Sequence, residues 1–165
     1  MARSRTALQK PPQRKPSETR SAISVAVANR QRRHTVDKRL LIHAVQTVLR
    51  VEKIEQGEIS IAIVSDKAIH EINRRFLAHD EPTDVISFLL EHRPGYIEGE
   101  IVASADTAAA AARRFKTTPA DELLLYIIHG TLHLIGYDDL SAGDRKTMHT
   151  RQRKYLEQIK RKPKP

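Results

Sequence analysis

The sequence predicts an α+β fold in a single domain, and three observations support this prediction. The chain has 165 residues, enough for one domain with a sizeable core. Stretches in which apolar residues alternate are interleaved with stretches in which they recur at helical spacing. Two alternating stretches are joined by a short connection, which is typical of an antiparallel pair. A small sheet of four strands packed with helices accounts for this pattern.

The first part of the chain is expected to contain two strands with a helix between them. Apolar residues alternate over 23–27 and again over 59–63, as they do on half-buried strands. Between these strands, Thr35 or Asp37 can cap a helix with a regular apolar face. We interpret Gly57 as the turn that precedes the second strand.

The elements that follow are bounded by clear capping and turn residues. Ser65 or Asp66 can cap a helix, and Pro82 favours a turn that leads into the next strand. Pro94 and Gly95 break the chain again. The expected elements are a third strand over 85–90, a fourth strand over 96–104, an alanine-rich helix over 105–115, and a last helix that begins after Ser141 and runs toward Lys160.

A buried helix is expected between the alanine-rich helix and the last one. Thr118 is its N-cap, Pro119 its first residue, and Asp121 the third residue of a capping box. Residues 123–135 are apolar on nearly every face, which predicts burial. Gly136 can adopt a positive φ and end the helix.

The buried helix carries two histidines at metal-ligand spacing. His129 and His133 are four residues apart, so their side chains lie one turn apart on one face. After the chain reverses at Gly136, the carboxylate of Asp139 can join the two imidazoles. Three protein ligands with an open fourth position are typical of a catalytic zinc site. The alternative is that both histidines are core residues bonded to backbone carbonyl groups.

Gly130 separates this motif from that of the zinc proteases. Proteases of the H-E-x-x-H type carry a glutamate after the first histidine, where it activates the attacking water. Gly130 can neither accept nor donate a proton. Phosphodiester hydrolysis depends less on such a base, because a metal ion can supply hydroxide and stabilise charge on the phosphoryl oxygens. The motif therefore favours a nucleic-acid substrate over a peptide.

The positive charge of the chain is concentrated at its two ends. Residues 1–33 hold nine Lys or Arg against one acid, and residues 151–165 hold seven against one. The ends thus carry +14 and residues 34–150 carry −5, since the whole chain carries +9. These basic ends either bind a polyanion or are simply exposed to solvent without a binding role. We expect a disordered basic extension over 1–20, a metal-dependent hydrolase domain over 21–160 and a basic tail over 161–165.

Two absences narrow the class of protein. The chain has no cysteine, so disulfides and thiolate metal sites are excluded. No apolar run reaches the roughly 18 to 20 residues that a membrane helix needs, and the basic N-terminus lacks the apolar segment of a signal peptide. We expect a soluble cytoplasmic protein without a membrane partner.

Two motifs resemble those of the YbeY-type single-strand endoribonucleases of bacteria, also called rRNA maturation factors. The first is His-Gly-Thr-Leu-His-Leu-Ile-Gly-Tyr-Asp-Asp at 129–139, followed by Asp144 and Met148. The second is Asp-Glu-Pro-Thr-Asp-Val-Ile-Ser-Phe at 80–88, after which 99–104 resembles the family's next strand. The resemblance covers roughly residues 21 to 158.

The resemblance implies a fold, an activity and a setting. It implies a small mixed sheet with helices mainly on one side, and one Zn²⁺ per chain held by His129, His133 and Asp139. It also implies hydrolysis of single-stranded ribosomal RNA, in 3′-end maturation of 16S rRNA and in ribosome quality control, with the ribosome or its small subunit as partner. The main alternative to an endoribonuclease is a non-catalytic ribosome assembly factor in which zinc only stabilises the fold. A metallopeptidase is the less favoured alternative.

The chain departs from the family pattern at two positions. Asp139 stands where the family usually has a third histidine. A carboxylate is a harder metal ligand than an imidazole, and it lowers the net charge of the site by one. Leu77 stands where the family usually has an arginine, and leucine cannot bind phosphate. Arg74 or Arg75 can take over phosphate binding if one faces the cleft, or both are solvated on the helix surface.

Three further residues are candidates with an ordinary structural alternative. Asp138 is a candidate catalytic base or an orienting partner for a histidine, and it can equally cap its turn. Thr83 and Asp84 are candidate substrate-binding residues by resemblance, although Pro-Thr-Asp is also common turn chemistry.

Overall fold

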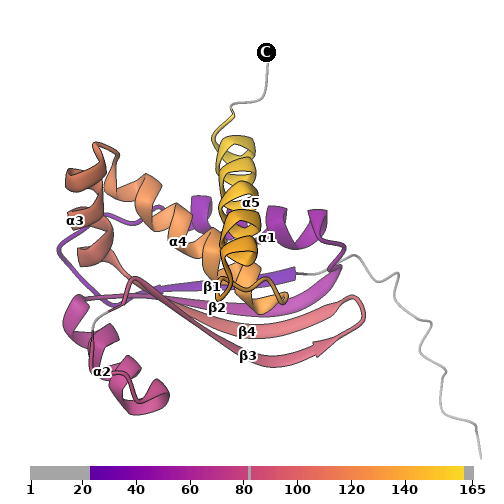
Figure 1. Cartoon of the computed structure of the whole chain (residues 1–165), viewed down its shortest axis with the longest axis horizontal. Coiled ribbons are helices and arrows are strands. Elements are labelled where there is room, and N and C mark those ends of the chain that lie inside the picture. Colours follow the sequence, from indigo (N-terminus) through magenta and orange to yellow (C-terminus); the bar gives the residue numbers. More distant parts are fainter. Residues whose placement is uncertain (1–22, 82, 162–165) are drawn as a thin grey trace, which may run out of the picture.

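The computed structural model describes residues 23–81 and 83–161, and it shows one α+β domain built on a mixed sheet of four strands (Figure 1). The strand order is β1-β2-β4-β3. The first three of these are parallel, and β3 is antiparallel to β4. The strands are β1 (Ile23–Asn29), β2 (Gln56–Val64), β3 (Val85–Arg93) and β4 (Tyr96–Ser104). The predicted single α+β domain and its mixed sheet are confirmed.

Five helices connect and cover the strands. They are α1 (Lys38–Val51), α2 (Asp66–Leu77), α3 (Ala105–Phe115), α4 (Pro119–Leu134) and α5 (Ala142–Lys160). α1, α4 and α5 lie on one side of the sheet, whereas α2 lies below one end of it (Figure 1). This agrees with the expectation of helices mainly on one side.

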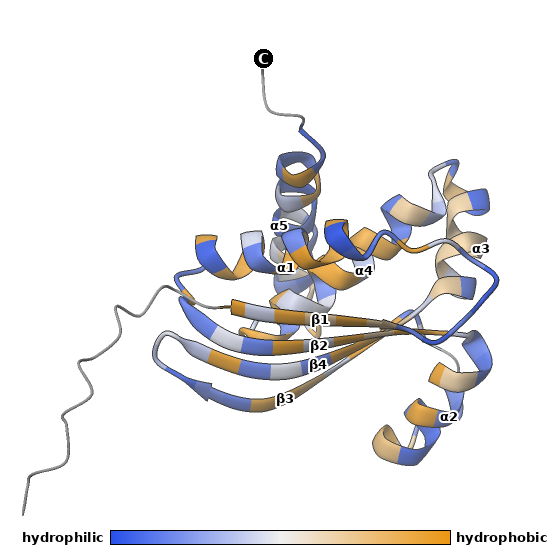
Figure 2. Ribbon diagram, turned by 180° about the vertical axis from the view of Figure 1, so that it is seen from behind, coloured by the Kyte–Doolittle hydropathy of each residue, from blue (hydrophilic) through white to orange (hydrophobic). Residues whose placement is uncertain are grey.

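The core lies between the sheet and α4. Figure 2 shows hydrophobic residues along α4 where it crosses the strands, while α5 is largely hydrophilic. The inward side chains of the three parallel strands, among them Ile61 and Ile101, are almost fully buried against Leu124, Ile128 and Leu132 of α4. This packing holds α4 firmly on the sheet, because the helix has few solvent-facing residues.

Helix boundaries follow the capping residues closely. Of the two N-cap candidates that the sequence offered for each of the first two helices, the structure uses Asp37 for α1 and Ser65 for α2. Thr118 and Ser141 cap α4 and α5 as expected. Each cap side chain accepts a hydrogen bond from a backbone N–H in the first turn.

Two boundary predictions were wrong. Gly57 is not a turn residue but lies inside β2, paired with Ile97 of β4. The chain instead reverses after α1 at Lys53, whose φ is 65°. β3 continues past the predicted end at residue 90 to Arg93, because a bulge between Leu89 and Glu91 restores its pairing with β4.

Some predictions fall on residues that the structure does not describe. These are the basic extension over 1–20, the turn at Pro82 and nearly all of the tail over 161–165. Within the described part of the chain, no helix combines the length and the apolar character that crossing a membrane requires.

Candidate metal centre

The candidate site lies at the C-terminal end of α4, where the chain reverses. The N–H of Tyr137 donates to the carbonyl of Leu132 at 3.1 Å, and the N–H of Gly136 donates to the carbonyl of His133 at 3.1 Å. Gly136 has a φ of 101°, so this is the Schellman ending that a glycine favours. The reversal brings Asp139 back beneath the last turn of the helix.

Three donor atoms from this segment converge. The Nε2 atoms of His129 and His133 are 2.9 Å apart, and Oδ2 of Asp139 is 3.5 Å from each. Ligands that bind zinc tetrahedrally at about 2.0–2.1 Å are about 3.3 Å from one another. The three distances bracket that value, so the donor set fits a small divalent ion such as Zn²⁺.

Gln152 of α5 fixes the orientation of the first histidine. Its Oε1 lies 2.6 Å from Nδ1 of His129, and its side chain is buried. Because a carbonyl oxygen only accepts, Nδ1 must carry the proton, which leaves Nε2 with a free lone pair facing His133. This arrangement is the usual second layer of support around a metal-binding histidine. The sequence reasoning missed Gln152, since nothing in its local sequence links it to a histidine 23 residues earlier.

The donor set opens onto a cavity of about 470 Å³. The side chains of His129, His133 and Asp139 are 23%, 29% and 40% exposed, so each has a solvent-facing side. Thr83 and Asp84, both predicted to bind substrate, line the same cavity. The site therefore has room for a substrate beside the ligands.

The other predicted residues lie around this cavity in different ways. Leu77 lines it together with Asn73, so its apolar side chain shares this cavity with the candidate metal ligands. Arg74 lines a separate hollow with Lys67, His70, Glu71 and Asp80, and Arg75 is exposed on α2. Among the described residues that line the metal-side cavity, neither arginine is present.

The side chain of Asp138 bonds to the backbone of the next residue, Asp139. Its Oδ1 accepts the N–H of Asp139 at 2.7 Å, which fixes the backbone of that residue. Its side chain is exposed and is absent from the described lining of the metal-side cavity.

Gly130 serves the packing of α4 on the sheet. A Cβ atom at this position would lie 2.9 Å from Cγ2 of Ile101 and 2.9 Å from Oγ of Ser87. Ser87 also donates a hydrogen bond to the carbonyl of Gly130 at 2.9 Å. A side chain here would point into the sheet and not toward the histidines, so this position cannot supply the glutamate of the protease motif.

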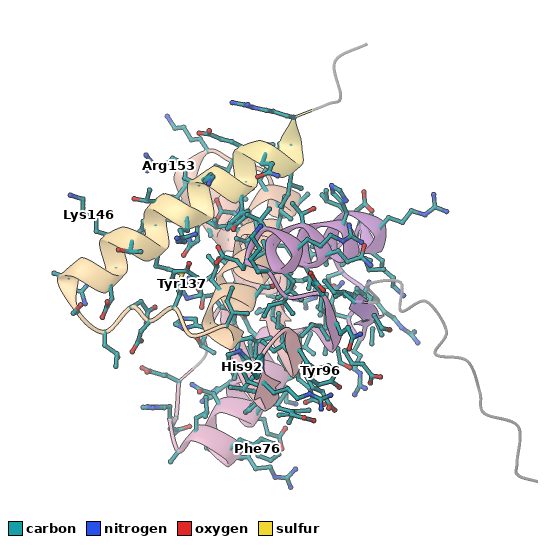
Figure 3. The ribbon with its side chains drawn as sticks, turned by 90° about the vertical axis from the view of Figure 1, so that its right-hand side faces the viewer. Phe76, His92, Tyr96, Tyr137, Lys146 and Arg153 are labelled. Carbon is teal, nitrogen blue, oxygen red and sulfur yellow. The ribbon has the colours of Figure 1, made fainter. Side chains whose placement is uncertain are left out.

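A second polar cluster anchors the turn that carries Asp139. Glu52, at the end of α1, accepts hydrogen bonds from the hydroxyls of Tyr137 at 3.0 Å and Tyr155 at 2.6 Å, and from Nη1 of Arg151 at 2.8 Å. Figure 3 shows Tyr137 beneath α5, where the cluster lies. Burial, and then the hydrogen bond to Glu52, raise the pKa of both tyrosines. The cluster ties α1, the turn and α5 together.

The comparisons with known proteins agree with the two motifs and with the fold. A family model described as Endoribonuclease YbeY matches residues 26–160. A Syntrophus aciditrophicus protein named Endoribonuclease YbeY is 39% identical over 134 residues, which cover 78% of this chain and 83% of that protein. A Rhodopirellula baltica protein of the same name is 46% identical over 110 residues, which cover 66% of this chain but only 57% of that protein.

A solved structure shares the fold. The solution structure of TM1509 from Thermotoga maritima matches with a TM-score of 0.58 at 29% identity, over 84% of this chain and 89% of that one. Sequence, fold and the two motifs thus lead to one conclusion, that the chain belongs to the YbeY family.

Proposed function

We propose that this protein is a zinc-dependent endoribonuclease that hydrolyses phosphodiester bonds in single-stranded RNA, with one Zn²⁺ per chain. The observation that carries the proposal is the convergence of His129, His133 and Asp139 at the mouth of an open cavity, in a chain whose relatives are named endoribonucleases. When bound, Zn²⁺ supplies Lewis acidity, which lowers the pKa of water and stabilises charge on phosphoryl oxygens.

The chain's own residues hold the reacting groups in place. Gln152 keeps the proton of His129 on Nδ1, and the cluster around Glu52 fixes the turn that presents Asp139. Thr83 and Asp84 face the cavity and contact the substrate. Among the described residues, Asp84 lines the cavity and is a carboxylate placed to accept a proton, whereas Asp138 is not part of the lining, and cleavage rates of Asp84→Asn and Asp138→Asn test this assignment.

Two observations favour a nuclease over the alternatives. A zinc ion with a purely structural role is usually enclosed by four protein ligands. Here the candidate site has three ligands, and their exposed sides face a cavity. A peptidase of the H-E-x-x-H type needs a glutamate at position 130, where a side chain would enter the sheet. Both observations support catalysis on a phosphodiester.

The proposed biological setting rests on the resemblance to the family. We propose that the substrate is ribosomal RNA and that the protein acts in the cytoplasm, on or near the small ribosomal subunit, in 16S rRNA 3′-end maturation and ribosome quality control. The net charge of +9 supports a polyanionic partner.

The test combines metal content with cleavage. Mass spectrometry of the purified protein is expected to find about one zinc per chain, lost in His133→Ala and Asp139→Ala, together with cleavage of single-stranded RNA. His43→Ala, an exposed histidine on α1, is the matched control and should retain both. Cleavage by His133→Ala at the rate of the control would refute the proposal. Retained biological function of a folded, inactive variant would favour the assembly factor.

A further inference from the structure

A second cavity, larger than the one beside the histidines, lies at the end of the sheet. Its volume is about 760 Å³, and five of its lining residues are cationic. We call it the basic cleft and define it by Arg30, Arg32, Arg33, Lys67 and Arg113. Figure 2 shows the connection between β1 and α1 as a hydrophilic stretch that passes beside α3 and α2. The cleft therefore joins three segments that are far apart in the sequence.

The basic cleft occupies the position where open parallel sheets usually bind ligands. The parallel strands β1, β2 and β4 end at Asn29, Val64 and Ser104, and the cleft lies just beyond these carboxyl ends. α2 and α3 begin at this edge, so their positive helix ends also face the region.

The acidic groups in the cleft are already engaged. Asp66 accepts hydrogen bonds from the hydroxyls of Ser104 and Thr107. Asp106 accepts the N–H of Asp66 at 3.0 Å and a hydrogen bond from His34 at 3.0 Å. The backbone bond from Asp66, and after it the bond from His34, lower the pKa of Asp106. Both carboxylates therefore act as structural acceptors.

The cations, in contrast, are available. Across residues 23–81 and 83–161, none of the five makes a side-chain hydrogen bond or lies within 4.0 Å of a carboxylate, and all five are exposed. Five cations and two carboxylates leave the lining at +3 when His34 is neutral. This contrasts with the net −5 of residues 34–150.

The loop that carries three of the arginines is held in one conformation. The amide of Gln31 donates to Oδ1 of Asn29 and to the carbonyl of His34, both at 2.8 Å. Its Oε1 accepts the N–H groups of Arg33 at 3.0 Å and His34 at 2.9 Å. A fixed loop loses little conformational entropy when it binds a ligand.

A short hydrogen-bonded path links one lining residue of the basic cleft to one lining residue of the metal-side cavity. Asp84, which lines the metal-side cavity, accepts the N–H of Ser104 through its carbonyl at 2.9 Å. The hydroxyl of Ser104 bonds in turn to Asp66, which lines the basic cleft. This path runs through the buried Ser104 and places a lining residue of each cavity within two hydrogen bonds of the other.

We infer that the basic cleft binds phosphate groups of the RNA strand away from the bond that is cut. This inference rests on the proposed function for the identity of the strand. Guanidinium groups bind phosphate oxygens through two parallel hydrogen bonds, and the rigid loop presents three of them together. The cleft contributes affinity for the RNA and fixes the position of the strand along the protein, and it does not recognise the identity of any base.

The test neutralises one cation from each segment of the cleft, in the variant Arg33→Gln, Lys67→Gln, Arg113→Gln. The matched control is Lys38→Gln, Arg39→Gln, Arg50→Gln, which removes the same charge from exposed positions of α1 that line neither cavity. Binding of a fluorescent single-stranded RNA is measured by anisotropy over a range of salt concentrations, with His133→Ala added to every protein to prevent cleavage.

The cleft variant is expected to bind RNA at least about tenfold more weakly than the control. The slope of log K against log salt should fall by about 2, because each phosphate contact on a single strand contributes about 0.7. Equal affinities and slopes for the two variants would overturn the inference. If the parent protein never cuts RNA but the cleft variant still binds RNA more weakly than the control, the proposed nuclease is refuted and the cleft stands. If the parent protein cuts RNA but the cleft variant binds RNA as tightly as the control, the cleft alone is refuted.

Discussion

Replacing Gln152 by leucine tests whether α5 supports the metal centre. Gln152 is 6% exposed, and its Oε1 accepts the proton on Nδ1 of His129 at 2.6 Å. Leucine is of similar size but has no acceptor. With a metal ion on Nε2 the proton must stay on Nδ1, so the cost of losing the acceptor falls mainly on the metal-bound state.

The expected loss is in metal affinity. Removing a supporting hydrogen bond of this kind typically weakens metal binding about 10- to 100-fold, or about 1.4–2.7 kcal/mol. The metal-free protein should be nearly as stable as the parent, because His129 is 23% exposed and can bond to water. Gln152→Glu is the matched control, since its carboxylate still accepts the proton.

The assay is a competition titration with a chromogenic zinc chelator, combined with urea unfolding of the metal-free proteins. We expect Gln152→Leu to lose zinc at a lower chelator concentration than the parent, and Gln152→Glu to retain it. Zinc affinities of the parent and Gln152→Leu that agree within a factor of two would refute the positioning role. Loss of stability in the metal-free leucine variant would show that Gln152 serves the fold instead.

Three further predictions concern packing, ionisation and substrate binding. Gly130→Glu should lower the free energy of unfolding in urea by about 3 kcal/mol or more, because its side chain would meet Ile101 and Ser87 at 2.9 Å; near-parent stability would contradict the packing role. Burial, with smaller contributions from nearby carboxylates, raises the pKa of Tyr126 to about 12, whereas the unfolded chain ionises near 10. The shift of Tyr126 should therefore cost the folded state up to about 3 kcal/mol of stability as the pH rises from 10 to 12. Tyr126→Phe should lose that much less than the parent over this range, and equal losses in the two proteins would refute the prediction. Leu77→Arg places a cation in the metal-side cavity and should raise kcat/KM for RNA about tenfold, the worth of one charge-assisted hydrogen bond of about 1.5 kcal/mol, whereas Leu77→Met should not.

Local sequence patterns predicted most of the secondary structure. β4 and α3 have the bounds expected from the sequence, because Gly95 and Ser104 mark their starts clearly. The errors came where a tertiary interaction overrode a local signal. Gly57 looks like a turn residue, yet cross-strand pairing with Ile97 holds it inside a strand.

The candidate ligands were predictable for a similar reason. His129 and His133 lie on one helix, whose 3.6-residue period fixes their relative positions, and Gly136 dictates where the chain turns back. Asp139 is three residues beyond that turn, so its approach to the histidines also follows from local geometry.

Local sequence was enough to predict most of the elements, the candidate metal-ligand set and the family, because each depends on residues close together in the chain. The tertiary structure alone shows which distant side chains meet. It placed Gln152 against His129, turned Leu77 toward the metal-side cavity, and gathered Arg33, Lys67 and Arg113 into one cleft. Such contacts depend on how helices pack on the sheet, and no spacing within one segment encodes them.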